Sequence, residues 1–443
     1  MALSRRHFFF GSLLAGAVPQ GGFGSTPSLR MLGFKSPNEK LNIASIGAGG
    51  KAASDIRGCS PTENIVALCD VDDKSAADIY KQFEKPPKYK DFRKMLDKEG
   101  SGIDAVIIAI PDHMHATAAM HCMARGKSVY VQKPLCRTIW EARQLMEAAA
   151  KYKVATQMGN QGYSNEGTRQ CAEMVWAGEI GNVTEVYAWT DRPMWPQGLT
   201  EIPPGDPVPA TLDWDNWLGI ANQRPFTIGG KGYPTEYGNF YQPFNWRGFY
   251  DFGCGALGDM ACHILGAPNL ALKLGNPTSV ECIKKEGTSS FMFPKSSVIK
   301  FEFPARGSMP PVKLFWHDGL KENPSSLPGV PAGEVLGDLG PVRRPQAEGQ
   351  GAGRGGPRQE TGAVGSVFRY EEGAAYQPAR VPDGSLFVGE KGMLTTGTYG
   401  EDTRLIPVAK RRQNFTEVEL PFAEAMALRE AKRCLRCDYR AKE

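Results

Sequence analysis

Two side chains that can move protons stand four residues apart in the segment GALGDMACHI, which contains Asp259 and His263. On a helix, residues at this spacing project from one face. Oxidation of an alcohol needs a base for the O–H proton, and imidazole titrates near neutral pH, so His263 suits that role. Asp259 could orient the imidazole or bind a neighbouring hydroxyl. An isolated Asp–His pair is more often a surface or capping pair, so the spacing alone leaves both interpretations open.

A lysine at the end of an apolar run is the third candidate. The segment KSVYVQKP predicts a strand that ends at Lys133, after the polar Gln132 and directly before Pro134. Ligands of open α/β sheets bind at the carboxyl ends of strands, and an ammonium there can stabilise a developing alkoxide. The alternative is a lysine that only reaches solvent from the strand end. Pro134 fixes the backbone direction and is compatible with a cis bond.

A glycine-rich turn predicts a dinucleotide site. Gly47, Gly49 and Ala52 form a G-x-G-x-x-A pattern between a predicted strand and a predicted helix. The first glycine permits a tight turn, the second lets a pyrophosphate approach, and the helix start attracts its charge. Asp70 follows Gly49 by 21 residues, at the end of the next strand, where a carboxylate binds ribose hydroxyls and repels the extra phosphate of NADP. We therefore predict NAD, with NADP less favoured. The alternative is a glycine turn without nucleotide.

The elements that must position these residues fall into two groups. Predicted strands at 41–47, 64–70, 103–111, 127–134 and 154–159 alternate with helical segments. This alternation is typical of a parallel, doubly wound Rossmann sheet. After about residue 160, alternating segments such as 182–190 and 297–305 predict an α+β domain with a large open, mainly antiparallel sheet. The predicted parts are a signal and linker at 1–38, a Rossmann domain at 39–160, an α+β domain at 161–415 with a Gly/Pro-rich loop at 320–365, and a basic tail at 416–443.

The glycine turn, IAIPDHMHATAA, VYVQKPL and GALGDMACH resemble, in order and spacing, the Gfo/Idh/MocA oxidoreductases, which include glucose–fructose oxidoreductase and inositol dehydrogenase. The resemblance covers roughly residues 40–315. It implies a Rossmann domain followed by an α+β domain with an open sheet, bound NAD(P), and sugar or polyol substrates.

The resemblance also implies roles for single residues. Lys133 matches the family's catalytic lysine near the nicotinamide, and Asp259 and His263 match the Asp and His that face the substrate. The family's usual motif is Glu-Lys-Pro, so Gln132 is a departure that removes a negative neighbour of Lys133; we do not take it as a loss of activity. The predicted cofactor-binding residues are Gly47, Gly49, Gly50, Lys51, Asp70, Pro111, His115, Gln132 and Lys133.

Aromatic and polar side chains that suit a sugar ring are concentrated in DRPMWPQG and YQPFNWRGFYDFG. A sugar presents apolar C–H faces to aromatic rings and hydroxyls to polar groups. The alternative for each aromatic is a core or subunit-interface position. The tentative substrate residues are Asn160, Gln161, Trp195, Tyr241, Asn245, Trp246 and Arg247.

Other chemistry-bearing residues give weaker signals. Asp112 is predicted to cap the helix that begins there and ends at Gly126. His113 and His115 form an H-x-H pair at the start of this helix, but a metal site would need further ligands, so we predict packing near the helix start and no metal. Cys434 and Cys437 form a C-x-x-C pair without two further cysteines beside them, which is too few for a cluster or zinc. The chain has 10 cysteines, and most stand in apolar runs, so we predict few or no disulfides.

Composition and the N-terminus bound the remaining possibilities. A net charge of +4 over 443 residues is too small to indicate nucleic-acid binding. Arg5 and Arg6 precede a short apolar stretch, a pattern typical of a twin-arginine export signal. We therefore expect a periplasmic protein, anchored only if the signal is not cleaved, with no membrane span after it.

The leading hypothesis is an NAD-dependent oxidoreductase that acts on a secondary hydroxyl of a sugar, polyol or glycoside and holds its cofactor tightly, because free NAD is scarce outside the cytoplasm. One alternative is an NAD-dependent glycosidase or lyase, in which transient oxidation acidifies a C–H, the glycosidic bond eliminates and hydride returns. A second is a non-catalytic sugar or nucleotide binder. A homo-oligomer through the C-terminal sheet is a further expectation.

Overall fold

The part of the chain that the computed structural model describes forms two sheets. It comprises residues 39–229, 239–287, 289–322 and 382–406, with 324, 327, 329–331 and 334–338 between them. The chain divides into two compact units, one ending at Ile107 and the other beginning at Ile108. The predicted signal, most of the Gly/Pro-rich loop and the predicted basic tail lie outside the described residues. This division does not test the predicted domain limits at 160 and 415, which stay predictions.

The first sheet has six strands in the order β3-β2-β1-β4-β5-β6. The pairs β1–β2, β2–β3 and β5–β6 are parallel. This order confirms the doubly wound prediction, although the short strand β3 was not predicted. The strands are β1 (Asn42–Ile46), β2 (Asn64–Cys69), β3 (Lys88–Tyr89), β4 (Ala105–Ile108), β5 (Ser128–Gln132) and β6 (Thr156–Gly159).

Two of the three helices described in the first unit begin at carboxylate caps where the chain leaves a strand. They are α2 (Gly50–Cys59), α3 (Asp73–Gln82) and α4 (Phe92–Glu99), followed by the 3₁₀ turn η1 (Gly100–Gly102). Asp72 accepts from the backbone N–H of Lys74, and Asp91 accepts from that of Arg93. Such caps satisfy N–H groups that have no partner within the helix. Helix α2 is different, because it begins at Gly49 with no side-chain cap.

The second unit adds two long helices and several short ones. They are α5 (Asp112–Met123), α6 (Ile139–Tyr152), η2 (Gln161–Ser164), α7 (Glu166–Trp176), α8 (Trp214–Leu218), η3 (Asn245–Gly248), α9 (Gly255–Ile264) and α10 (Gly266–Leu272). Helix α6 begins with a capping box, in which Thr138 accepts from the backbone N–H of Glu141 and the Glu141 carboxylate accepts from that of Thr138. In the described residues no helix is long and apolar enough to cross a membrane.

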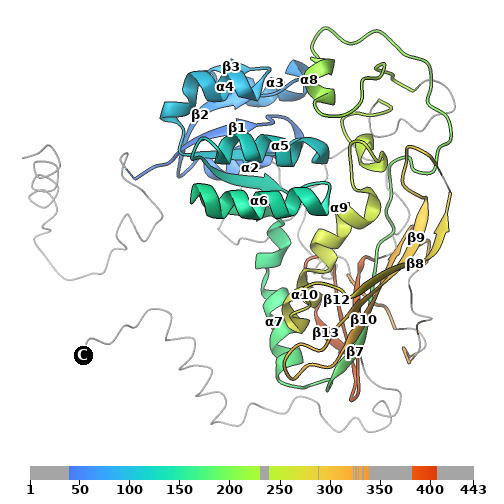
Figure 1. Cartoon of the computed structure of the whole chain (residues 1–443). Helices are drawn as coiled ribbons and strands as arrows, with labels where there is room; N and C mark the ends of the chain where they lie inside the picture. The colour runs from blue at the N-terminus through green and yellow to red at the C-terminus, as the bar shows by residue number, and fades with distance from the viewer. Residues whose placement is uncertain are drawn as a thin grey trace, which may run out of the picture. The chain divides into compact units, whose positions relative to one another are not determined.

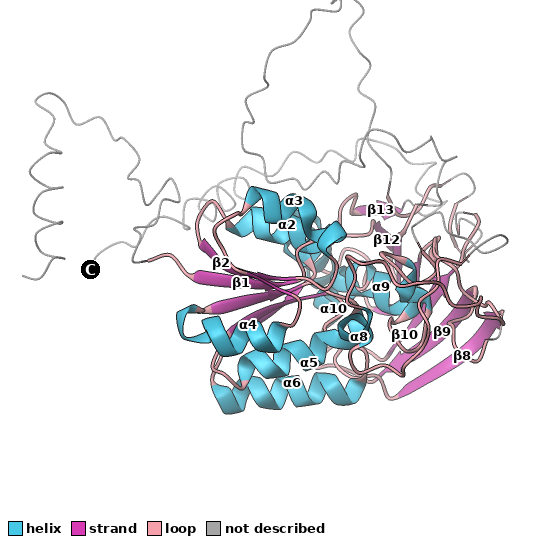
Figure 2. Cartoon of the chain, turned by 90° about the horizontal axis from the view of Figure 1, so that it is seen from above, coloured by secondary structure: helices cyan, strands magenta, loops and turns pink. Residues whose placement is uncertain are grey.

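The second sheet has seven strands in the order β13-β12-β11-β7-β10-β9-β8, all in the second unit. Strands β7 and β10 are parallel and the other neighbouring strands pair antiparallel, which confirms a mainly antiparallel sheet. Figure 2 shows β8, β9 and β10 side by side. The strands are β7 (Val183–Trp189), β8 (Ser279–Glu286), β9 (Ser296–Phe303), β10 (Val312–Asp318), β11 (Gly384–Gly389), β12 (Met393–Thr396) and β13 (Arg404–Ile406).

Helices α7, α9 and α10 cover one face of this sheet (Figure 1). Cys171 and Val175 of α7 pack with Ala267 and Ala271 of α10 against strand residues that include Val186. Met260 and Ile264 of α9 pack on Ala188 and Trp316. Burial of these side chains fixes which face of α9 points away from the sheet, and that face carries Asp259 and His263.

The capping box of α6 gives a test of local stability. We expect Thr138→Ala to lower the free energy of unfolding by about 1 kcal/mol, because one N–H at the helix start loses its acceptor. Thr138→Ser keeps the hydroxyl and serves as the control. Urea denaturation of both variants measures the difference. Equal stability of the alanine and serine variants would show that the box contributes nothing.

Candidate active site

The glycine turn of the first unit has the geometry that the sequence predicts for a dinucleotide. Gly47 has a positive φ of 95°, which favours glycine. A Cβ added at Gly49 would overlap Ser75, so the backbone there must stay bare. Helix α2 begins with no side-chain cap, and a helix start of this kind presents backbone N–H groups to an anion. The turn therefore fits a pyrophosphate.

Asp70 holds this turn from the end of the next strand. Its Oδ2 accepts from the backbone N–H of Ala48 at 2.7 Å and of Gly49 at 3.1 Å, and its Oδ1 accepts from that of Asp72 at 3.0 Å. Burial raises the pKa of Asp70, and these backbone N–H groups partly oppose that effect. Oδ2 already accepts twice, whereas Oδ1 accepts once and keeps a second lone pair that can accept from a ribose hydroxyl. The side chain of Lys51 instead contacts Asp55 of its own helix at 2.6 Å.

In the second unit, Lys133 and Asp259 come together although 126 residues separate them. The Lys133 ammonium donates to Oδ1 of Asp259 at 2.7 Å and to the Asp259 carbonyl at 2.8 Å. Arg247 Nε donates to the same Oδ1 at 3.0 Å. The Lys133–Pro134 bond is cis, as the sequence allowed. The end of β5, the turn η3 and helix α9 therefore meet at one carboxylate.

Asp259 is an anion between cations. Burial by itself would raise its pKa, but the charges of Lys133, Arg247 and Arg192 outweigh burial and hold the pKa of Asp259 well below its usual range. The sequence predicts that Asp259 orients His263 or binds a substrate hydroxyl, whereas the carboxylate contacts Lys133 and Arg247 in the structure. These contacts fix the ammonium in place, and the role toward His263 stays a prediction.

His263 lies one turn after Asp259 on α9 and is half-buried. Its imidazole packs edge-to-face on the ring of Tyr399, with 4.8 Å between ring centroids and an interplanar angle of 72°. Sequence reasoning missed Tyr399, because it stands in the loop between β12 and β13 and no local pattern connects it with α9. The structure thus adds an aromatic neighbour to the predicted base.

Asp112 is a second carboxyl that the sequence reading missed. We expected it to cap α5, but it is the first residue of that helix and makes no cap; the prediction was wrong. The residue is 3% exposed, and its carboxyl forms a hydrogen bond with the Cys254 thiol. Burial raises the pKa of Asp112 to about 7, helped by Asp259 and opposed by Arg247 and Lys133. Near neutral pH this carboxyl therefore stays protonated more readily than an exposed aspartate.

The H-x-H pair is buried and makes backbone contacts. His113 Nε2 lies 3.2 and 3.1 Å from the carbonyls of Trp217 and Leu218. His115 Nδ1 and Nε2 each lie 2.7 Å from a carbonyl, those of Pro134 and Ile110. Burial lowers the pKa of both histidines to about 4, so they are neutral at pH 7. A neutral imidazole has one N–H, so His115 can donate to only one carbonyl at a time. Among the described residues no group of three His, Cys, Asp or Glu could hold a metal.

The predicted substrate residues separate into two groups. Arg247 reaches the Asp259 carboxylate, and Asn160 Nδ2 donates to the Cys262 carbonyl at 3.5 Å. The others are buried at 0–6% exposure, in a cluster of stacked and edge-to-face rings or beside it; they are Trp195, Tyr241, Asn245 and Trp246. Burial of this kind fits the core alternative, and their contact with substrate stays a prediction. Of Gln161 only the backbone, at the start of η2, is described.

Two more predicted cofactor residues, Pro111 and Gln132, are placed as follows. Pro111 precedes α5 as its N-cap residue. Gln132 is 5% exposed, and its Oε1 accepts from the Lys133 backbone N–H at 3.4 Å. A Cβ added at Gly159 would lie within 3 Å of the Gln132 amide, so β6 leaves room for this side chain. The residue that departs from the family motif is thus packed beside the lysine rather than exposed.

The raised pKa of Asp112 predicts a pH-dependent stability. Between pH 4 and 7 the unfolded state ionises this carboxyl while the folded state keeps it protonated, so its contribution to stability is lost as the pH rises through that window. Asn mimics the protonated form. We expect Asp112→Asn to be more stable than the native protein by about 1–3 kcal/mol at pH 8 and by less at pH 5. Unfolding free energies from pH 5 to 8 measure this, with the exposed Asp78→Asn as the control. A gap that does not change with pH would contradict it.

Two protein-family models match the chain. The model described as an oxidoreductase family with an NAD-binding Rossmann fold matches residues 41–160. The model described as the C-terminal alpha/beta domain of the oxidoreductase family matches residues 175–284. Together they cover slightly more than half of the 443 residues.

Curated relatives match over shorter stretches. Inositol 2-dehydrogenase of Serratia proteamaculans is 30% identical over 145 residues, which are 32% of this chain and 43% of that protein. A glycosyl hydrolase family 109 protein of Solibacter usitatus is 31% identical over 181 residues, which are 36% of this chain and 39% of that protein. The matched stretches thus span less than half of these relatives.

The fold has solved counterparts. The WlbA dehydrogenase from Bordetella pertussis, solved in complex with NADH and UDP-GlcNAcA, aligns over 90% of both chains with a TM-score of 0.51 and 13% identity. At that identity the likeness shows the fold alone. The two family models and the shared order of strands and motifs show that the chain belongs to the Gfo/Idh/MocA family of NAD-binding oxidoreductases.

Proposed function

We propose that the protein is an NAD-dependent oxidoreductase that acts on a secondary hydroxyl of a sugar, polyol or glycoside and retains its cofactor between turnovers. The observation that carries this proposal is the Lys133 ammonium held 2.7 Å from Asp259 on the helix that also presents His263. A cation, an anion that fixes it and an imidazole are the groups that oxidation of an alcohol requires.

The contacts of Lys133 define its role. An ammonium has three N–H donors, and two of them are used on the carboxylate and carbonyl of Asp259. The third can be directed to a substrate oxygen, where it stabilises the alkoxide that forms as His263 removes the proton. Arg247 keeps the Asp259 carboxylate ionised and in place. When bound at the glycine turn, NAD supplies the hydride acceptor.

A second function, redox-assisted cleavage of a glycosidic bond, is supported by the relatives named as glycosyl hydrolase family 109 proteins. In that reaction a hydroxyl is oxidised, the neighbouring C–H is deprotonated, the bond eliminates and hydride returns, so no net oxidation occurs. The same Lys133 and His263 would serve both reactions. A binder without catalysis remains the third hypothesis.

One experiment separates the three functions. The purified protein is incubated, with no added NAD, with myo-inositol, a panel of free sugars and a panel of 4-nitrophenyl glycosides that includes the α-N-acetylgalactosaminide. We expect NADH absorbance that persists and stops at one equivalent of bound cofactor. Many turnovers of 4-nitrophenol with unchanged cofactor absorbance would favour the glycosidase, and no change with any compound would favour the binder.

His263→Ala tests the assigned base in the same assay. We expect a loss of at least about 100-fold in the rate, because the variant removes the imidazole that we assign to take the proton. His121 is a half-buried histidine of α5, so His121→Ala is the matched control and should keep the native rate. Equal rates of the two variants would remove His263 from the mechanism.

We further propose NAD rather than NADP as the cofactor, on the charge of Asp70 at the glycine turn. Native mass spectrometry of the purified protein should find NAD as the retained dinucleotide. Asp70→Asn keeps an acceptor for Ala48 and Gly49 but removes the charge, so we expect the preference for NAD over NADP in binding to fall by about tenfold or more. Retention of NADP by the native protein, or an unchanged preference in the variant, would contradict this assignment.

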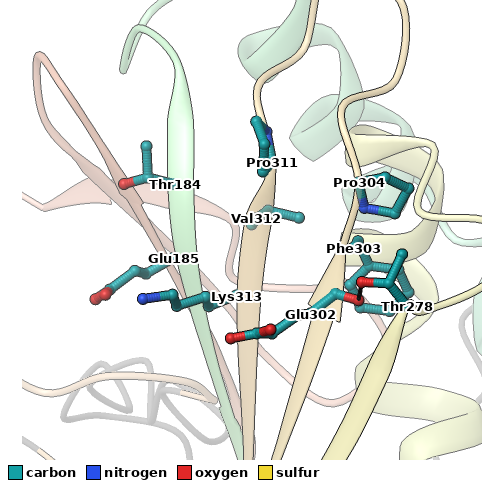
Figure 3. Close-up of a pocket in the computed structure, with 9 residues that line it drawn as sticks. All are labelled: Thr184, Glu185, Thr278, Glu302, Phe303, Pro304, Pro311, Val312 and Lys313. Atoms are coloured by element: carbon teal, nitrogen blue, oxygen red, sulfur yellow. Dashed lines mark hydrogen bonds between the residues drawn. The ribbon is translucent and has the colours of Figure 1, made fainter.

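The partner and location of the protein also stay proposals. Strand β8 is exposed along its whole length, and Val280 and Ile283 on it are 58% and 51% exposed. A neighbouring depression of about 420 Å³ is lined by β7, β9 and β10, where Glu185, Lys313 and Glu302 stand side by side (Figure 3). We propose that a second copy covers this face, and the same native mass spectrum counts the subunits.

Export by the twin-arginine route rests on residues 1–38, which the structure does not describe.

A further inference from the structure

Tyr399 contacts the predicted base from a distant part of the chain. It stands in the loop between β12 and β13, and its ring centroid lies 4.8 Å from that of His263 at an interplanar angle of 72°. Edge-to-face contacts of this kind favour one orientation of the two rings over others. The imidazole is therefore held by a specific neighbour and not only by its own helix.

The loop that carries Tyr399 is fixed against the start of α7. A Cβ added at Gly162 would overlap the Tyr399 ring, and one added at Gly167 would overlap the Gly400 carbonyl. Thr168 Oγ1 donates to the Tyr399 carbonyl at 3.2 Å. The missing side chains of Gly162 and Gly167 thus let the loop pack closely on this segment, and Thr168 adds a hydrogen bond.

The other side of the loop is fixed by carboxylates. Asp338 accepts from the Thr398 backbone N–H at 3.0 Å and from the Thr398 hydroxyl at 2.7 Å. The Glu401 carboxylate accepts from the Tyr399 backbone N–H at 2.5 Å. Because hydrogen bonds hold both residues that precede Gly400, the backbone that carries the Tyr399 ring is fixed beside His263.

We propose that Tyr399 is a positioning residue for His263, which orients the imidazole for proton transfer by edge-to-face packing. The inference rests on the proposed function of His263 as the base. Burial raises the pKa of Tyr399 to about 12, so the phenol stays neutral and does not itself act as a base near pH 7. Charged groups that act on the phenol are Glu401, Arg192, Asp259 and Asp338. Since the contact is made by the ring, phenylalanine should replace tyrosine and leucine should not.

The test compares Tyr399→Phe with Tyr399→Leu. Two-dimensional NMR of ¹⁵N-histidine-labelled protein reports the tautomer and titration of His263, whose signal is identified by its loss in His263→Ala. We expect native signals in the phenylalanine variant and a changed tautomer ratio or titration in the leucine variant. With the substrate found by the panels above, we expect kcat to fall about tenfold or more in the leucine variant with KM within about threefold, and to stay within about twofold in the phenylalanine variant.

A second variant approaches the same contact from the other side. Gly162→Ala introduces a methyl group where the Tyr399 ring lies, so it should displace the ring and reproduce the His263 signals of the leucine variant. Gly58→Ala, in α2, adds a methyl group to open space and is the matched control. If Tyr399→Leu does not fold, Gly162→Ala decides the question.

The outcomes separate this inference from the proposed function. Native His263 signals in both Tyr399→Leu and Gly162→Ala would overturn the positioning role. Equal loss of kcat in the phenylalanine and leucine variants would also overturn it, because the hydroxyl and not ring packing would then be responsible. If no sugar or glycoside is turned over, the proposed function fails, but the NMR signals still show whether Tyr399 orients the imidazole.

Discussion

The second unit depends on one buried carboxylate oxygen that accepts from two cations. Asp259 Oδ1 lies 2.7 Å from the Lys133 ammonium and 3.0 Å from Arg247 Nε. Burying such charges is costly, and removal of one partner leaves an uncompensated ion at a cost of about 3–5 kcal/mol. A buried ion cluster of this kind need not stabilise the fold. It does fix the positions of its side chains, because few other arrangements would keep all three charges paired. It fixes the ammonium at the end of β5 and, through α9, the face that presents His263.

The surrounding elements explain how the chain brings these groups together. Met260 and Ile264 bury one face of α9 against the sheet, so Asp259 must point the other way. A Cβ added at Gly253 would overlap the backbone of Arg247, which shows that the turn between η3 and α9 folds back closely on itself. That close return places the guanidinium beside a carboxylate only 12 residues later. Burial of Met260 and Ile264 therefore orients α9, and the close turn at Gly253 brings Arg247 within hydrogen-bond distance of Asp259.

The sequence predicted the parts of this site that local patterns encode. The strand–turn–helix context gave the glycine turn and Asp70, the end of an apolar run gave Lys133, and helical spacing gave Asp259 and His263. It could not predict which side chains share a partner, because the contacts of Arg247 and Tyr399 depend on tertiary packing. Asp112 was misjudged for a related reason, since an acid after proline at a helix start usually caps, and only the packing shows that it is buried. The aromatic segment shows the limit of such patterns, because rings that suit a sugar face also suit a core.

The two buried carboxyls give the site its electrostatic character. Asp259 is held ionised by neighbouring cations, whereas burial raises the pKa of Asp112 to about 7. Environments that separate two carboxyl groups in this way are typical of sites that handle protons. When Asp112 is protonated, Lys133 and Arg247 carry two positive charges against one carboxylate, and Arg192 adds to the positive side. The excess can stabilise an alkoxide that forms beside Lys133. Ionisation of Asp112 would cancel much of this positive excess, and burial opposes that ionisation because it raises the pKa of Asp112.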